Sequence, residues 1–248
     1  MTGEQPGHGG VIFDVDGTLL DTNYLHVTAW WEAFRERGHD IRCADVHQAL
    51  GMGSAELVQQ VLGRADPSVI AAHSRHFAPY LGRMRPLPGA AGLLTATARL
   101  GLNVVVATSA KDDEVDLMLD AIGARDAIGT VVSSGAVERA KPHPDIVALA
   151  LGESGTDRAR AVMVGDAVWD VIAARRAGIP CIGVLSGGIA EEQLRDAGAV
   201  EVYPDPAALL GNLQASMIGQ LPGWAAGHVK PAGGRVEADL QTDQGRTS

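Results

Sequence analysis

Gly10-Val11-Ile12-Phe13-Asp14-Val15-Asp16-Gly17-Thr18-Leu19-Leu20-Asp21 is the stretch that decides the fold, because a short apolar run in it ends abruptly in acidic residues. The apolar run predicts a buried strand, and the Asp and Gly residues predict a loop at its carboxyl end. Similar runs recur at 103–108, 130–133, 161–164 and 181–185, and stretches of helical spacing lie at 112–122, 144–151, 168–177 and 191–197. Apolar strands that alternate with amphipathic helices indicate an α/β fold with a parallel sheet covered on both faces.

Between the first strand and the rest of the sheet, the chain shows only helical spacing. Four such stretches lie at 22–37, 44–50, 54–62 and 67–84. They predict an inserted four-helix domain at 22–85, while 10–21 and 86–215 form the α/β core. Glycine, proline and polar residues dominate 1–9 and 216–248, for which we expect flexible tails.

Composition excludes several classes of partner. The 248 residues carry 20 basic and 30 acidic side chains, a formal charge of −10, which argues against nucleic acid or an anionic membrane as the main partner. No apolar run approaches the roughly 18 residues that cross a bilayer, and no signal-peptide pattern is present, so we expect a cytoplasmic protein. Two cysteines are too few for a thiolate zinc site. The sequence does not indicate an oligomeric state.

Chemically capable side chains follow four of the predicted strands. Ligands of open parallel sheets bind outside the carboxyl ends of the strands. The first strand is followed by Asp14 and Asp16, the second by Thr108 and Ser109, the third by a loop with Lys141, and the fourth by Gly165 and Asp166, with Asp170 one turn into the next helix. We therefore expect carboxylates, hydroxyls and one amine to meet at one edge of the sheet.

This set of groups suits phosphoryl transfer. Closely packed carboxylates repel one another unless a cation neutralises them, and oxygen ligands without histidine or thiolate favour Mg²⁺. An amine and a hydroxyl can then hold a phosphoryl group, whose transfer needs mainly positioning and charge neutralisation. Asp14 can attack phosphorus to form an aspartyl-phosphate. Asp16 can protonate the leaving oxygen and later take a proton from water.

The motifs Asp14 to Asp21, Thr108, Lys141-Pro142 and Gly165-Asp166 through Asp170 resemble those of the haloacid dehalogenase-like (HAD) phosphohydrolases, in the same order. The resemblance covers residues 10–215. The helical insert is similar to the small cap of the phosphoglycolate phosphatase and β-phosphoglucomutase branch. The resemblance implies a HAD-like, Rossmann-like parallel sheet core with an inserted four-helix cap domain, and a phosphoric monoester hydrolase.

The resemblance also implies roles for several of the motif residues. Asp14 would be the nucleophile and Asp16 the acid/base. The phosphoryl oxygens would be held by Thr108, Ser109 and Lys141. Mg²⁺ would be held by Asp14, Asp166 and the backbone carbonyl of Asp16, with Gly17, Thr18 and Asp170 in support.

We therefore expect a Mg²⁺-dependent phosphatase that hydrolyses a small phosphomonoester, with the cap gating the site. One alternative is a phosphomutase of the β-phosphoglucomutase type, which the sequence makes weaker because Ser54 stands about where that branch has a cap arginine. Another alternative is a HAD-like module that binds ligands without turnover, although every catalytic position is filled. A Schiff-base phosphonatase is excluded because residues 22–86 contain no lysine.

Overall fold

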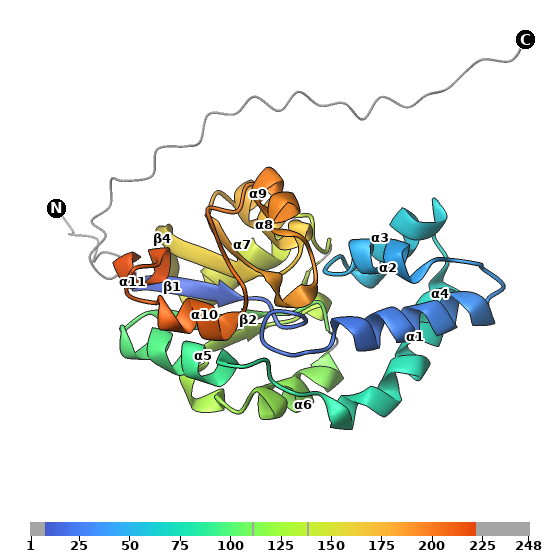
Figure 1. Ribbon diagram of the computed structural model, residues 1–248, viewed down its shortest axis with the longest axis horizontal. Helices are drawn as coiled ribbons and strands as arrows, with labels where there is room; N and C mark the ends of the chain where they lie inside the picture. Colours follow the sequence, from blue (N-terminus) through green and yellow to red (C-terminus); the bar gives the residue numbers. More distant parts are fainter. Residues whose placement is uncertain (1–7, 111, 138, 222–248) are drawn as a thin grey trace, which may run out of the picture.

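A six-stranded parallel sheet forms the centre of the protein (Figure 1). The computed structural model describes residues 8–110, 112–137 and 139–221. The strand order is β3-β2-β1-β4-β5-β6, and every neighbouring pair is parallel. The strands are β1 (His8–Phe13), β2 (Asn103–Ala107), β3 (Thr130–Val132), β4 (Thr156–Gly165), β5 (Cys181–Val184) and β6 (Glu201–Tyr203). The predicted α/β fold is thereby confirmed, and β6 is an edge strand that the sequence pattern does not reveal.

Helices cover both faces of the sheet, as Figure 1 shows. One face is covered by α5 (Ala90–Arg99), α6 (Asp112–Ile122), α10 (Pro206–Gly211) and α11 (Met217–Gln220), and the other by α7 (Asp145–Ser154), α8 (Val168–Ala177) and α9 (Glu191–Ala197). Because successive side chains of a strand point to opposite faces, Phe13 packs in the first layer and Ile12 in the second. Both side chains are fully buried, which explains why the central strand is a continuous apolar run.

Four helices lie beside the sheet, between β1 and α5 in the sequence (Figure 1). They are α1 (Asn23–Glu36), α2 (Cys43–Ala49), α3 (Ser54–Leu62) and α4 (Pro67–Phe77). They have a hydrophobic cluster of their own that includes Trp30, Phe34 and Leu57. We call this group the cap. The exact boundaries of the predicted domains stay a prediction.

The last predicted cap helix is shorter than its sequence pattern suggests. The pattern predicts one helix over 67–84, but α4 ends at Phe77 and a 3₁₀ helix, η1 (Ala78–Arg83), follows. Pro79 explains the break, because its nitrogen carries no hydrogen for the α-helical ladder.

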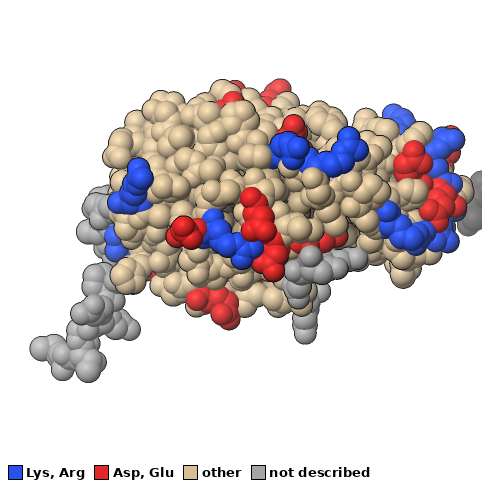
Figure 2. Space-filling model, turned by 90° about the horizontal axis from the view of Figure 1, so that it is seen from below, with Lys and Arg blue, Asp and Glu red and all other residues tan. Residues whose placement is uncertain are grey.

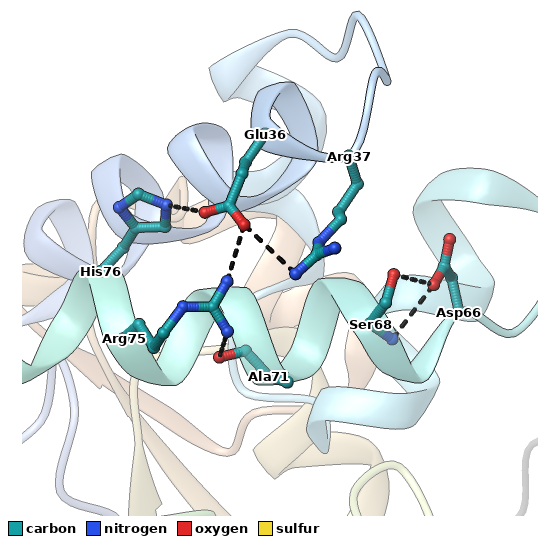
Figure 3. A network of polar contacts seen from close by, with 7 residues as sticks. All are labelled: Glu36, Arg37, Asp66, Ser68, Ala71, Arg75 and His76. Carbon is teal, nitrogen blue, oxygen red and sulfur yellow. Dashed lines mark hydrogen bonds and ion pairs between the residues drawn. The ribbon is translucent and has the colours of Figure 1, made fainter.

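Polar contacts join the end of α1 to α4 (Figure 3). The carboxylate of Glu36 lies 2.6 Å from Arg75, 2.8 Å from His76 and 3.2 Å from Arg37. At the start of α4, Asp66 accepts the backbone N–H of Ser68 at 3.1 Å and so caps the helix. Exposed ion pairs contribute little individually, so the apolar cluster supplies most of the cap's stability.

Both predicted tails, 1–9 and 216–248, include residues that belong to the α/β core. His8 and Gly9 belong to β1, and Ser216 begins a packed segment that contains α11. Ile218 and Leu221 are fully buried in the same hydrophobic cluster as Phe13. The prediction of a flexible segment is therefore wrong for residues 8–9 and 216–221. The remainder of the predicted tails, 1–7 and 222–248, lies outside the described residues.

Charged side chains of both signs are mixed on the face shown in Figure 2, including the cap end at the right. No continuous basic surface lies on that face, in keeping with the net charge of −10. Among the described residues, no helix has the length and apolar character needed to span a bilayer.

Candidate active site

The predicted site residues meet at the carboxyl end of the sheet, next to the cap. Strand β1 lies between β2 and β4, so the residues that follow these three strands are neighbours. Asp14 follows β1 and donates its backbone N–H to the Val164 carbonyl at 2.9 Å. Thr108 follows β2 and Asp166 follows β4. The sheet topology therefore brings together residues that are up to 152 positions apart in the sequence.

A buried lysine connects two of the carboxylates. The Lys141 amine contacts a carboxylate oxygen of Asp14 and lies 2.8 Å from Oδ1 of Asp170. All three side chains are buried. Burial by itself lowers the pKa of Lys141, but the charges of Asp14 and Asp170 outweigh burial and raise it above its ordinary value. The amine is therefore a fixed positive charge at the sheet edge.

Three carboxylates form the acidic part of the site. Oxygens of Asp14, Asp166 and Asp170 all lie within 4.8 Å of one another. Burial raises the pKa of Asp14 well above its usual range, although Lys141 opposes this shift. Burial, with the charge of Asp170, raises the pKa of Asp166 to about 7. Three carboxylates against one amine leave the cluster short of positive charge, and their hard oxygen donors fit Mg²⁺.

Glycines leave the space that Asp166 needs. A Cβ atom at Gly187 would lie 1.7 Å from Oδ2 of Asp166, and one at Gly17 would lie 2.4 Å from it. Gly17 also has φ +76°, a conformation that side-chain-bearing residues rarely adopt. Thr18 donates its hydroxyl to Oδ1 of Asp166 at 3.2 Å. Gly17 and Thr18 thus lie against Asp166, where the sequence predicts supporting residues.

Asp16 lies outside this carboxylate cluster. Its Oδ1 accepts the hydroxyl of Thr22 at 2.5 Å and lies 3.3 Å from Nε2 of His26. Burial alone would raise the pKa of Asp16, but the charge and hydrogen bond of His26 and the hydrogen bond of Thr22 lower it below its ordinary value. The side chain of Asp16 is therefore ionised at neutral pH, and the expected contribution of its backbone carbonyl to a metal stays a prediction.

The two hydroxyl residues predicted at the end of β2 lie in different places: Thr108 is in the interior, and Ser109 is at the pocket. Thr108 is fully buried, and its Oγ1 accepts the backbone N–H of Ala110 at 3.0 Å, so its own hydrogen is available to another acceptor. Ser109 lines the pocket that also contains Asp14 and Asp16.

A small pocket of about 80 Å³ separates the carboxylates from the cap. Its core side is formed by Asp14, Asp16 and Ser109. Its cap side includes Trp30, His73 and the turn at 51–54. A larger groove of about 810 Å³ lies beside α5 and α6 and contains none of the predicted site residues. The cap turn therefore faces the candidate site rather than serving only as a link between helices.

Sequence reasoning missed Thr22, which donates to Asp16, and Asn23, which touches the carboxylate cluster. Asn23 donates its amide to Oδ2 of Asp166 at 2.8 Å and to the Gly187 carbonyl at 3.1 Å. An asparagine near a helix start normally suggests a cap, so its local position gave no signal of this contact. His26, which the sequence places on the first cap helix, reaches Asp16 as described above.

Several known proteins are similar to this chain in sequence and in fold. The family model of haloacid dehalogenase-like hydrolases matches residues 11–184. The phosphoglycolate phosphatase of Rhodospirillum rubrum is 32% identical over 215 residues, which cover 80% of this chain and 88% of that protein. A hydrolase from Pseudomonas syringae has a TM-score of 0.78 and 31% identity, over 84% of this chain and 98% of that one. CbbY from Rhodobacter sphaeroides, solved with phosphate, has a TM-score of 0.67 and 28% identity, over 82% and 96% of the two chains. The chain therefore belongs to the haloacid dehalogenase-like hydrolases, the family that its sequence motifs indicate.

Proposed function

We propose that this hydrolase is a Mg²⁺-dependent phosphatase that cleaves a small phosphomonoester through an aspartyl-phosphate on Asp14. The observation that carries the proposal is the buried set of Asp14, Lys141, Asp166 and Asp170 beside a pocket under the cap. A phosphatase needs a nucleophilic oxygen, positive charge around it and a place for the leaving group, and this site offers all three.

Magnesium fits the donor set. Asp14, Asp166 and the Asp16 carbonyl would hold it, with Asp170 beside them, and it would supply charge neutralisation for the phosphoryl oxygens. Lys141 and the hydroxyls of Thr108 and Ser109 would bind those oxygens from the protein side. The Lys141 amine is held by carboxylates on two elements, so it needs little reorganisation to do so.

The first half of the reaction joins Asp14 to phosphorus. An Asp14 oxygen forms a bond to phosphorus as the ester P–O bond breaks, and Asp16 gives its proton to the leaving oxygen. His26 and Thr22 keep Asp16 ionised in the free protein. The negative phosphoryl group of a bound substrate opposes that effect and favours the protonated form that this half requires.

The second half returns Asp14 to its starting state. A water oxygen attacks phosphorus, its proton passes to the Asp16 carboxylate, and the bond between Asp14 and phosphorus breaks to release inorganic phosphate. The cap side of the pocket excludes other water during the first half.

Relatives support a small phosphorylated substrate. The Rhodospirillum rubrum relative is a phosphoglycolate phosphatase, and the Rhodobacter sphaeroides CbbY has been solved with phosphate and with xylulose-1,5-bisphosphate.

Phosphate release from an aryl phosphate, with and without Mg²⁺, tests the proposal. We expect the wild type to be active with Mg²⁺, and Asp14→Asn to lose detectable turnover because the amide is a poor nucleophile. Asp21→Asn is the matched control, since Asp21 lies in the same loop with an exposed side chain, and it should stay active. An inert wild type across many phosphomonoesters would instead indicate a binding module, and phosphoryl transfer that needs a bisphosphate primer would indicate a mutase.

A further inference from the structure

Asn23 is the first residue of the first cap helix, yet its side chain reaches into the core of the site. The residue is 6% exposed. It follows Thr22, the N-cap residue of α1. Its amide donates to Oδ2 of Asp166 at 2.8 Å and to the Gly187 carbonyl at 3.1 Å. A buried amide that serves two acceptors outside its own helix is fixed by those acceptors.

Asp166 is held on both of its oxygens. Thr18 donates to Oδ1 at 3.2 Å, and Asn23 donates to Oδ2. A carboxylate restrained at both oxygens keeps one orientation toward the other carboxylates of the cluster. Groups that orient a metal ligand in this way affect metal affinity although they do not touch the metal.

The Gly187 carbonyl connects this amide to a second cap helix. It lies 2.8 Å from Nε2 of His47 on α2, in addition to its bond from Asn23. The neighbouring Ser186 donates its hydroxyl to the Gly17 carbonyl at 2.6 Å. Hydrogen bonds therefore connect the 3₁₀ helix η4 (Leu185–Gly187) to the cap and to the loop after β1, with Asp166 beside it.

We propose that Asn23 is a positioning residue that orients Asp166 for Mg²⁺ and so makes metal affinity depend on the placement of cap helix α1. This inference rests on the proposed function, because it assumes that Asp166 binds the metal. It goes beyond that function by assigning a cap residue to the metal site. A metal bound more tightly when α1 is in place must in return favour that placement of the cap.

Titration of the metal-free protein with Mg²⁺, measured by calorimetry, tests the proposal. Asn23→Leu keeps the approximate volume but removes the donor, and Asn23→Ala removes both. We expect both variants to bind Mg²⁺ about 10–100-fold more weakly than the wild type. Higher Mg²⁺ concentration should restore their turnover of an aryl phosphate, which would not happen if they were simply misfolded.

Asn103→Ala is the matched control. Asn103 also donates its amide twice, to the Ser154 carbonyl at 2.9 Å and to the Thr156 hydroxyl at 3.0 Å, but it lies at the opposite end of β2 from the site. It should bind Mg²⁺ like the wild type.

Four results would overturn the positioning role. They are unchanged Mg²⁺ affinity in both Asn23 variants, equal weakening in Asn103→Ala, failure of both Asn23 variants to fold while Asn103→Ala folds, and lost turnover that excess Mg²⁺ does not restore. A wild type that does not bind Mg²⁺ would instead refute the metal dependence in the proposed function.

Discussion

Asp14 and Asp16 are two residues apart but lie in opposite electrostatic environments. The pKa of Asp14 is raised, chiefly by burial, whereas the pKa of Asp16 is lowered because His26 and Thr22 outweigh burial. His26 on α1 and Thr22 just before it therefore give Asp16 a lower pKa than Asp14, although the two side chains are chemically identical. In the metal-free protein this order is the reverse of the one that the proposed roles need, so a nucleophilic Asp14 depends on the positive charge of Lys141 and of the Mg²⁺ that would bind beside it.

Replacement of Asp16 should slow both halves of the reaction. We expect Asp16→Ala to reduce kcat by about 10²–10⁴-fold, the usual contribution of general acid/base help. Rapid-mixing measurement of leaving-group release and of phosphate release separates the two halves. Unchanged rates for both would show that the assigned role is wrong, and Asp21→Ala serves as the control for a carboxylate lost from the same loop.

At the scale of elements, the short 3₁₀ helix η4 packs directly against the side chain of Asp166. A Cβ atom at Gly187 would lie 1.7 Å from Oδ2 of Asp166, so a larger residue must displace that carboxylate or the loop. Gly152, on α7, has no atom within 4 Å of its would-be Cβ. A side chain at position 187 would therefore collide with Asp166, whereas a side chain at position 152 would meet no other atom.

Gly187→Ala and Gly152→Ala should therefore have opposite effects. We expect Gly187→Ala to lower both the melting temperature and the Mg²⁺ affinity, because the added methyl group displaces Asp166. We expect Gly152→Ala to stabilise the protein by up to about 1 kcal/mol, since alanine is the better helix former. Thermal denaturation and Mg²⁺ titration of both variants check this, and wild-type Mg²⁺ affinity in Gly187→Ala would contradict the packing argument.

At the scale of the whole molecule, we expect the acidic cluster to make the stability of the fold depend on both pH and Mg²⁺. The pKa of Asp166 is about 7 in the folded chain, against 3.8 for an ordinary aspartate. Between these two values the folded state binds more protons than the unfolded state, so this group makes the metal-free protein less stable as pH rises from about 4 to about 7. Above pH 7 the full penalty is present.

Magnesium should remove that penalty. At pH 8 we expect Mg²⁺ at one hundred times its dissociation constant to stabilise the fold by about 2.7 kcal/mol, which is visible as a higher melting temperature than in a chelator. At pH 5.5 the gain should be smaller, because protons compete with the metal for the carboxylates. Asp166→Asn should lose most of the gain at both pH values because the amide replaces a metal ligand, and identical wild-type melting curves with Mg²⁺ and chelator at pH 8 would contradict the account.

Local patterns in the sequence determined much of this protein. Apolar runs that lead into Asp, Thr, Ser or Gly predicted five of the six strands and the edge at which their ends meet. The spacing of the motifs indicated the family. These features are legible because strand periodicity, turn residues and the carboxyl-end rule act over a few residues. Strand β6 and the helices α5, α10 and α11 were missed; β6 has a single aliphatic residue between Glu201 and Tyr203 and therefore shows no apolar run.

Tertiary structure alone decided which groups touch. Lys141 pairs with Asp14 across 127 positions, and Asn23 bonds Asp166 across 143. Ile218 and Leu221, in a segment whose composition predicts a tail, are buried because the sheet offers an apolar layer for them. Contacts of this kind depend on where the whole sheet and cap place two distant segments, and the energy of burying a charge or an apolar group is set by all the neighbours at once.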